Sequence, residues 1–181
     1  MAQLEDMLAF NRRFVEEKAY QPYCAGSRPM KKMTIVTCMD CRLIELLPRA
    51  LDLANGDAII VKSAGAVVDE PYGAVMKSVL VSLYELGSKA VYIIGHSDCG
   101  MHQMSGAKIS GDIRRRAGET ALKAAEQQCG NLQGWLNGFE SLEEAVKASA
   151  EMVRSHPLLP PQTPVYALTI DPVSGKLTLV R

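Results

Sequence analysis

The chain has 181 residues, a length typical of one domain that can bury its own core without disulfide bonds. Hydrophobic residues make up 48% and charged residues 22%, which is typical of soluble globular proteins and not of disordered chains. Twenty basic residues balance twenty acidic ones, so no charge excess favours nucleic acid or anionic lipid as a partner. No apolar run approaches the ~20 residues of a membrane span, and residues 1–6 lack the basic and apolar parts of a signal peptide. We therefore expect a cytoplasmic protein that binds neither nucleic acid nor membranes.

An amphipathic helix is predicted near the N-terminus. Apolar residues recur at helical spacing between residues 4 and 15, with charged residues between them. Residues 21–29 contain two prolines and a glycine, which predict a loop. Residues 1–20 should therefore form a helical arm whose apolar face needs a surface to cover it, and a second subunit is the expected source of that surface.

The centre of the chain alternates between strand and helix patterns. Short apolar, β-branched runs at 33–37, 58–61 and 90–94 are typical of parallel strands covered on both faces. Helical patterns at 43–54 and 71–86 lie between them. Strands that alternate with helices predict right-handed crossovers and a parallel sheet.

The C-terminal part is predicted to be helical first and then extended. Residues 111–155 are alanine-rich and charged and predict helix, with a break at 130–138. The runs 165–170 and 177–180 predict two strands with a turn, added at one edge of the sheet. The predicted fold is thus a single α/β domain over residues 1–181, with a mainly parallel, doubly wound sheet flanked by helices and completed by edge strands from the tail.

Residues that can bind a metal follow two of the predicted strands. The first strand runs into Cys38, Asp40 and Arg42, and the third runs into His96 and Cys99. Neighbouring parallel strands end at the same edge of a sheet, where sites form in open α/β folds. Two thiolates and one imidazole that leave a fourth position open are typical of catalytic zinc. The pattern predicts one Zn²⁺ per chain at this edge.

Asp40 and Arg42 form a second element of the expected site. Two thiolates already neutralise Zn²⁺, so a third anion gains only modestly by joining, and Arg42 offers Asp40 a competing bidentate partner. If Asp40 pairs with Arg42, the fourth position is open to water. If Asp40 moves onto the metal, as a possible fourth ligand of a closed state, water is excluded.

The sequence C-x-D-x-R followed by H-x-x-C, residues 38–42 and 96–99, resembles the β-class carbonic anhydrases. Residues 61–66 are also similar to the Arg-Asn-Ala-Gly segment of that family, with Lys62 and Ser63 in place of Arg and Asn, and residues 98–101 are similar to its short archaeal and mycobacterial branch. The resemblance implies reversible hydration of CO₂ to bicarbonate and a proton by a zinc-bound hydroxide.

The same resemblance implies roles for individual residues. Cys38, His96 and Cys99 would be the zinc ligands, Asp40 would orient the hydroxide by accepting its hydrogen bond, and Arg42 would hold Asp40 away from the metal. It also implies a homodimer or a tetramer in which the N-terminal helix embraces the partner. Because two thiolates donate more charge than three imidazoles, we expect activity to be favoured at alkaline pH.

Other functions are compatible with the same residues. A hydrolase of COS or CS₂ would use the same zinc scaffold, because these linear molecules resemble CO₂. A non-catalytic zinc protein would need no Asp40–Arg42 pair. A C-x-x-C redox protein would use Cys38 and Cys41, but it would not need the second cluster.

Several further residues have more than one interpretation. His102 lies close enough to Cys99 in sequence to be a candidate proton relay, although an ordinary core or surface histidine is the favoured interpretation. Asp98 is interpreted as a carboxylate that caps a turn. Cys24 and Cys129 are expected to be buried or half-buried thiols, and Trp135 a packing residue.

Overall fold

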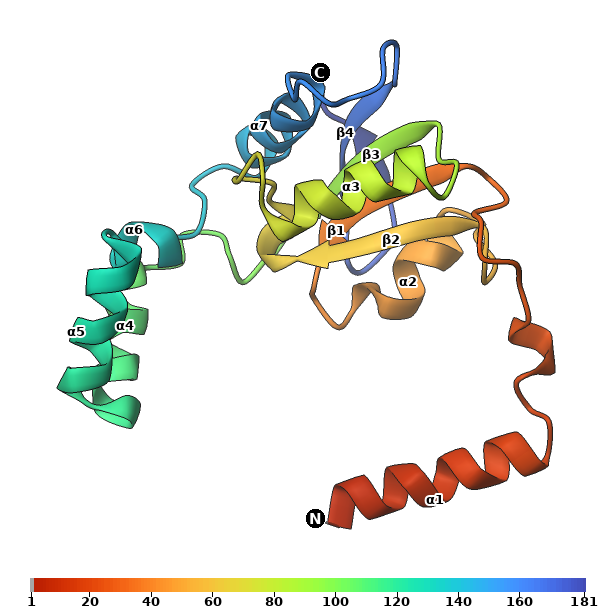
Figure 1. Cartoon of the computed structure of the whole chain (residues 1–181), viewed down its shortest axis with the longest axis horizontal. Helices are drawn as coiled ribbons and strands as arrows, with labels where there is room; N and C mark the ends of the chain where they lie inside the picture. The colour runs from red at the N-terminus through yellow and green to blue at the C-terminus, as the bar shows by residue number, and fades with distance from the viewer. Residues whose placement is uncertain (1) are drawn as a thin grey trace.

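The computed structural model describes residues 2–181 and arranges them around one five-stranded sheet (Figure 1). The strands are β1 (Met33–Cys38), β2 (Ala58–Ser63), β3 (Ala90–His96), β4 (Val165–Ile170) and β5 (Leu177–Leu179). Their spatial order is β2-β1-β3-β4-β5, and only β5 runs antiparallel to its neighbour. The predicted α/β class, the mainly parallel sheet and the edge strand from the tail are confirmed.

The two faces of the sheet pack against different helices. Helices α3 (Ala74–Tyr84) and α7 (Leu142–Arg154) cover one face, and α2 (Leu43–Ala50) covers part of the other. Successive β1 residues point to opposite faces, so Val36 packs with α3 and α7 while Ile35 packs with α2. Both side chains are completely buried. This double cover explains why the parallel strands read as continuous apolar runs.

Gly95, near the end of β3, allows α7 to lie close to the sheet. A Cβ atom at Gly95 would lie 2.7 Å from Leu142 Cδ1 and 2.7 Å from Val146 Cγ1. Such distances are too short for carbon atoms in van der Waals contact. The glycine therefore brings the start of α7 against the end of β3 that precedes His96.

Two helices are shorter than their sequence patterns predicted. The predicted helix at 43–54 ends at Ala50, because Asp52 has the left-handed φ of +51° and stops the helical ladder. The predicted helix at 71–86 begins at Ala74, after a turn in which the Gly73 N–H donates to the Glu70 carbonyl. Its predicted Pro71 start is therefore wrong by three residues.

Residues 106–136 form a lobe of short helices that Figure 1 shows projecting away from the sheet. Its helices are α4 (Gly106–Ala117), α5 (Glu119–Cys129) and α6 (Leu132–Leu136). The predicted break at 130–138 is only partly correct. A first break falls at Gly118, with φ +88°, and α6 occupies most of the predicted break because Asn131 caps it by accepting from the Gly134 N–H.

The N-terminal helix α1 (Ala2–Glu16) is present as predicted, but within residues 2–181 no layer of the fold buries any of its side chains. None of its residues is buried, and five of its apolar side chains are at least half exposed: Leu4, Met7, Leu8, Phe10 and Val15. Figure 1 shows α1 well separated from the sheet, joined to it through the short 3₁₀ helix η1 (Gln21–Tyr23). Within residues 2–181, no helix combines the length and the apolarity needed to cross a bilayer.

Candidate metal centre

Parallel strands β1 and β3 are direct neighbours in the sheet and end side by side. Cys38 is the last residue of β1, His96 is the last residue of β3, and Cys99 follows three residues later. Their ligand atoms all lie within 4.8 Å of one another, and the two sulfur atoms are 3.8 Å apart. All three residues are buried. The structure thus brings together the two stretches of chain that the sequence placed at one edge of the sheet.

The orientation of His96 fits a metal site. Its Nδ1 lies 2.8 Å from the carbonyl oxygen of Ser97, to which it donates, so the lone pair lies on Nε2. Within residues 2–181, that buried Nε2 has no hydrogen-bond partner. Buried polar atoms are rarely left unpaired unless they have another role. Two sulfur atoms and one free imidazole nitrogen match the donor set of zinc with one position open.

The two thiols differ in their readiness to ionise. Burial raises the pKa of Cys38, but the adjacent His96 imidazole and the backbone N–H groups of Asp40 and Gly65 outweigh burial and lower it. Burial raises the pKa of Cys99, and the neighbouring Cys38 charge raises it further. The two thiols therefore favour a state in which they carry a single negative charge between them. A bound cation would supply the charge that ionises the second thiol, with release of its proton.

Asp40 lies at the mouth of this site and is held by Arg42. The carboxylate accepts from Arg42 Nη2 at 2.9 Å, from Nε at 3.1 Å and from the backbone N–H at 2.8 Å. These bonds from the Arg42 side chain and backbone lower the pKa of Asp40 to about 2, so it is ionised near neutral pH. Asp40 Oδ2 also lies 3.7 Å from His96 Nε2. The structure therefore shows the arrangement in which Asp40 pairs with Arg42 beside the three ligand atoms.

The end of β2 supports the loop that carries Cys38 and Asp40. Lys62 Nζ lies 3.3 Å from the Cys38 carbonyl oxygen and 3.5 Å from that of Asp40, and the Ser63 carbonyl accepts from the Met39 N–H. The backbone N–H of Gly65 helps to lower the pKa of Cys38, and Gly65 has a φ of +70°. The segment in which this chain departs from the usual Arg-Asn pair is therefore in direct contact with the site loop.

Asp98 has a role that the sequence analysis missed. Its carboxylate oxygen Oδ2 accepts from Arg42 Nη1 at 2.8 Å, and its backbone carbonyl accepts from Arg42 Nη2 at 2.9 Å. Its interpretation as a turn-capping carboxylate therefore misses its main contact. The two residues are 56 positions apart, so the pairing depends on β1 and β3 being neighbours. An acidic residue beside a predicted ligand was the available signal.

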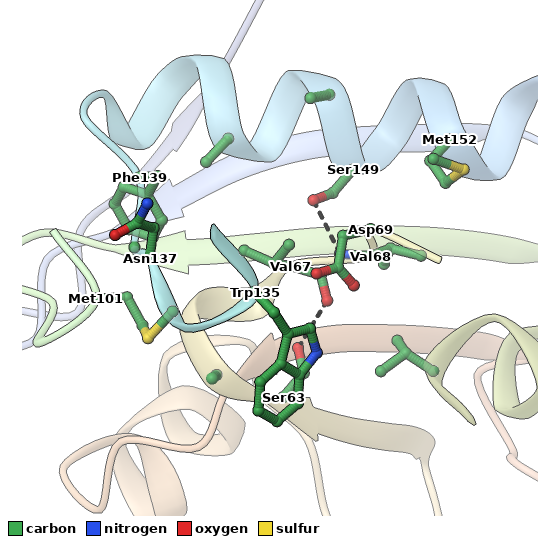
Figure 2. Close-up of a pocket in the computed structure, with 15 residues that line it drawn as sticks. Ser63, Val67, Val68, Asp69, Met101, Trp135, Asn137, Phe139, Ser149 and Met152 are labelled. Carbon is green, nitrogen blue, oxygen red and sulfur yellow. Dashed lines mark hydrogen bonds between the residues drawn. The ribbon is translucent and has the colours of Figure 1, made fainter. Parts of the chain in front are cut away.

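A cavity of about 580 Å³ lies next to the site, between α7 and the segment after β2 (Figure 2). Its lining is mostly apolar and includes Val67, Met101, Trp135 and Phe139. Met101 and Phe139 also pack against the apolar cluster that contains Cys38 and Cys99. Trp135 lines this cavity and is 63% exposed, so most of its surface is open to water.

The remaining sequence candidates lie away from the three ligands or are exposed. His102 Nε2 lies 3.0 Å from the Glu140 carbonyl, and the residue is exposed. All five cysteines are free, and Cys41 is exposed. Cys24 and Cys129 are exposed as well, so their predicted burial is wrong. Cys24 follows η1, which has no buried residue, and Cys129 ends α5, in which only Leu122 is buried.

The chain combines an α/β fold with a Cys-His-Cys group at the carboxyl ends of its strands, and comparison with known proteins identifies the family. The profile of the carbonic anhydrase family matches residues 33–170. The chain belongs to this family, in its β class.

Three proteins illustrate the similarity. YvdA of Bacillus subtilis, provisionally named a carbonic anhydrase, is 48% identical over 181 residues, which cover 99% of this chain and 92% of YvdA. The crystal structure of β-carbonic anhydrase isoform I from Trichomonas vaginalis superposes with a TM-score of 0.88 at 28% identity, covering 99% of this chain and 98% of that one. A carbon disulfide hydrolase of Saccharolobus solfataricus is 26% identical over 160 residues, which cover 81% of this chain and 76% of the hydrolase.

Proposed function

We propose that the protein catalyses the reversible hydration of CO₂ to bicarbonate and a proton, with one Zn²⁺ held by Cys38, His96 and Cys99. The observation that carries this proposal is the position of Asp40, an ionised acceptor held by Arg42 at 3.7 Å from the free nitrogen of His96. A metal with three protein ligands and an acceptor beside its open position suits activation of water. Membership of the β-carbonic anhydrase family supports the same reaction.

Individual residues of the chain have different roles in the proposed reaction. Bound zinc supplies a lowered pKa for a coordinated water, toward ~7. Asp40 accepts a hydrogen bond and so orients the attacking oxygen. Arg42 keeps Asp40 paired and away from the metal, because its planar fork matches both carboxylate oxygens. The apolar side chains Val67 and Met101, which line the adjacent cavity, suit an uncharged linear substrate.

The experiment that tests this function is stopped-flow CO₂ hydration on zinc-loaded protein across a range of pH. Zinc-dependent turnover that rises toward alkaline pH supports the proposal. Protein with full zinc content and no turnover at any pH contradicts it. An Asp112→Asn variant, which removes a carboxylate from the helical lobe far along the chain, serves as the control and should retain full turnover.

Hydrolysis of CS₂ or COS is the second candidate function. It is favoured by the similarity to the carbon disulfide hydrolase of Saccharolobus solfataricus, which extends over 81% of this chain. The same three ligands and the same apolar cavity suit these molecules. Parallel assays of CO₂ hydration and of CS₂ and COS hydrolysis on one zinc-loaded sample separate the two functions by their kcat/KM values.

We further propose that the protein acts as a homo-oligomer, a dimer or a tetramer, in the cytoplasm. The exposed apolar residues of α1 support an oligomer, because no part of the same chain covers them. Five free cysteines support a reducing compartment. Sedimentation at micromolar concentration tests the oligomer, and a monodisperse monomer contradicts it.

A further inference from the structure

Arg42 is held from two loops at once. From its own loop, which follows β1, it pairs with the Asp40 carboxylate through Nε and Nη2. From the loop that follows β3, it pairs with Asp98 through Nη1 at 2.8 Å and Nη2 at 2.9 Å. A guanidinium has five N–H donors in a fixed plane, so partners on two sides fix the orientation of that plane.

We propose that Asp98 is a positioning residue that anchors Arg42, so that Arg42 presents fixed donors to Asp40. This inference rests on the proposed function and extends it to a residue outside the metal ligands and the Asp40–Arg42 pair. Without the second anchor, the guanidinium can rotate about its long side chain. Asp40 would then spend more time away from the orientation that the reaction needs.

The backbone conformation of Asp98 favours its contact with Arg42. Asp98 has a φ of +52°, a left-handed conformation that Asp, Asn and Gly adopt more readily than other residues. In this conformation its carboxylate and its backbone carbonyl both reach the same guanidinium. Because Cys99 is the next residue, one turn sets both a ligand sulfur and the anchor of Arg42.

Exposure limits what the Asp98–Arg42 pair contributes to stability. The Asp98 side chain is 84% exposed and that of Arg42 is 39% exposed, whereas that of Asp40 is 17% exposed. Water screens such a pair, and exposed ion pairs stabilise folds only slightly. We therefore expect changes at Asp98 to alter turnover more than they alter stability.

Two variants separate the charge of Asp98 from its backbone conformation. Asp98→Asn keeps an acceptor oxygen and tolerates the left-handed φ, but it removes the negative charge. Asp98→Gly removes the whole side chain and also tolerates that φ. We expect kcat for CO₂ hydration to fall about threefold in Asp98→Asn and about tenfold in Asp98→Gly, with KM and the zinc content unchanged. Asp112→Asn, which breaks an exposed ion pair with Arg115 on α4, is the matched control and should behave as the wild type.

The decisive readout is coupling to Arg42. In an Arg42→Ala background, Asp98→Asn should cause no further loss of kcat, because its only effect is exerted through Arg42. An equal loss in both backgrounds overturns the proposal. Loss of zinc in Asp98→Asn also overturns the proposal, because Asp98 would then act by maintaining the turn that carries Cys99.

A second measurement keeps the anchor testable if the proposed reaction is wrong. If zinc-loaded wild-type protein does not hydrate CO₂, the proposed function is wrong. The contact between Asp98 and Arg42 is then tested by thermal unfolding of the metal-free chain. The shifts in Tm caused by Asp98→Asn and Arg42→Ala should be non-additive in the double variant. Additive shifts contradict the anchor independently of any activity.

Discussion

Replacing Gly65 by alanine should destabilise the protein and loosen its metal site. The added methyl would lie 2.8 Å from Phe139 Cε1 and 3.2 Å from Met101 Cβ. Alanine at a φ of +70° costs about 1–2 kcal/mol. Crowding of a packed site by one methyl costs about 1–3 kcal/mol, so the loss in unfolding free energy should be about 2–5 kcal/mol.

Two other glycines separate these contributions. Gly87 has a φ of +81° with nothing near its Cβ position, so Gly87→Ala measures the backbone cost alone. Gly95 has no positive φ but would crowd Leu142 and Val146 at 2.7 Å, so Gly95→Ala measures the crowding alone. The assay is denaturant unfolding of the metal-free variants, with their zinc affinity measured separately.

Zinc affinity distinguishes Gly65 from its controls. Of these three glycines, Gly65 is the one whose backbone N–H lowers the pKa of Cys38, so Gly65→Ala should weaken zinc binding by roughly tenfold. If Gly65→Ala is no less stable than Gly87→Ala, the expected cost of crowding at Gly65 is refuted. An equal loss of zinc affinity in Gly87→Ala would contradict the expected role of the Gly65 N–H.

The other predictions concern the ligands, the Asp40 carboxylate and the arm. Cys99→Ser should retain less than about a tenth of the zinc, measured by metal analysis, and full zinc content would remove Cys99 from the ligand set. Asp40→Asn should keep its zinc but lose at least about tenfold in kcat. The reason is that an amide cannot both accept the hydrogen bond of the attacking oxygen and pair with Arg42 as a carboxylate does. Unchanged CO₂ hydration would reject the role of Asp40. The lowered pKa of Asp40 means that its stabilising contribution is complete above about pH 4 and is lost as the pH falls toward 2. The difference in unfolding free energy between wild type and Asp40→Asn should therefore shrink between pH 6 and pH 3, and a constant difference would show that the ion pair does not stabilise the fold. Leu8→Glu on α1 should shift the protein toward the monomer in sedimentation, and an unchanged oligomer would exclude this helix from the interface.

Periodicity predicted the strands well because buried parallel strands have an unmistakable apolar pattern. The run 165–170 coincides with β4, and each predicted strand of the parallel sheet lies within an observed one. The helix ends were less accurate, because they depend on single backbone conformations such as the left-handed Asp52 and Gly118. Those conformations leave little trace in a hydrophobic pattern.

The candidate metal site was predictable to the extent that it depends on strand order. Cys38 and His96 end two strands, and a parallel sheet brings such ends to one edge. The contact between Arg42 and Asp98 was not predictable, because it depends on the path of two loops and on a positive φ at residue 98. The exposure of Trp135 also escaped prediction, since it belongs to a lobe that packs on itself and not on the sheet.

We expect two thiolates and one imidazole to coordinate a single zinc ion and to leave one coordination position for a reactive oxygen. Zinc K-edge X-ray absorption on the zinc-loaded protein tests this expectation most directly. We expect one zinc per chain, with two sulfur neighbours at ~2.3 Å and two nitrogen or oxygen neighbours at ~2.0–2.1 Å. A shell without sulfur, or four protein ligands that include no free position in the active protein, would contradict it.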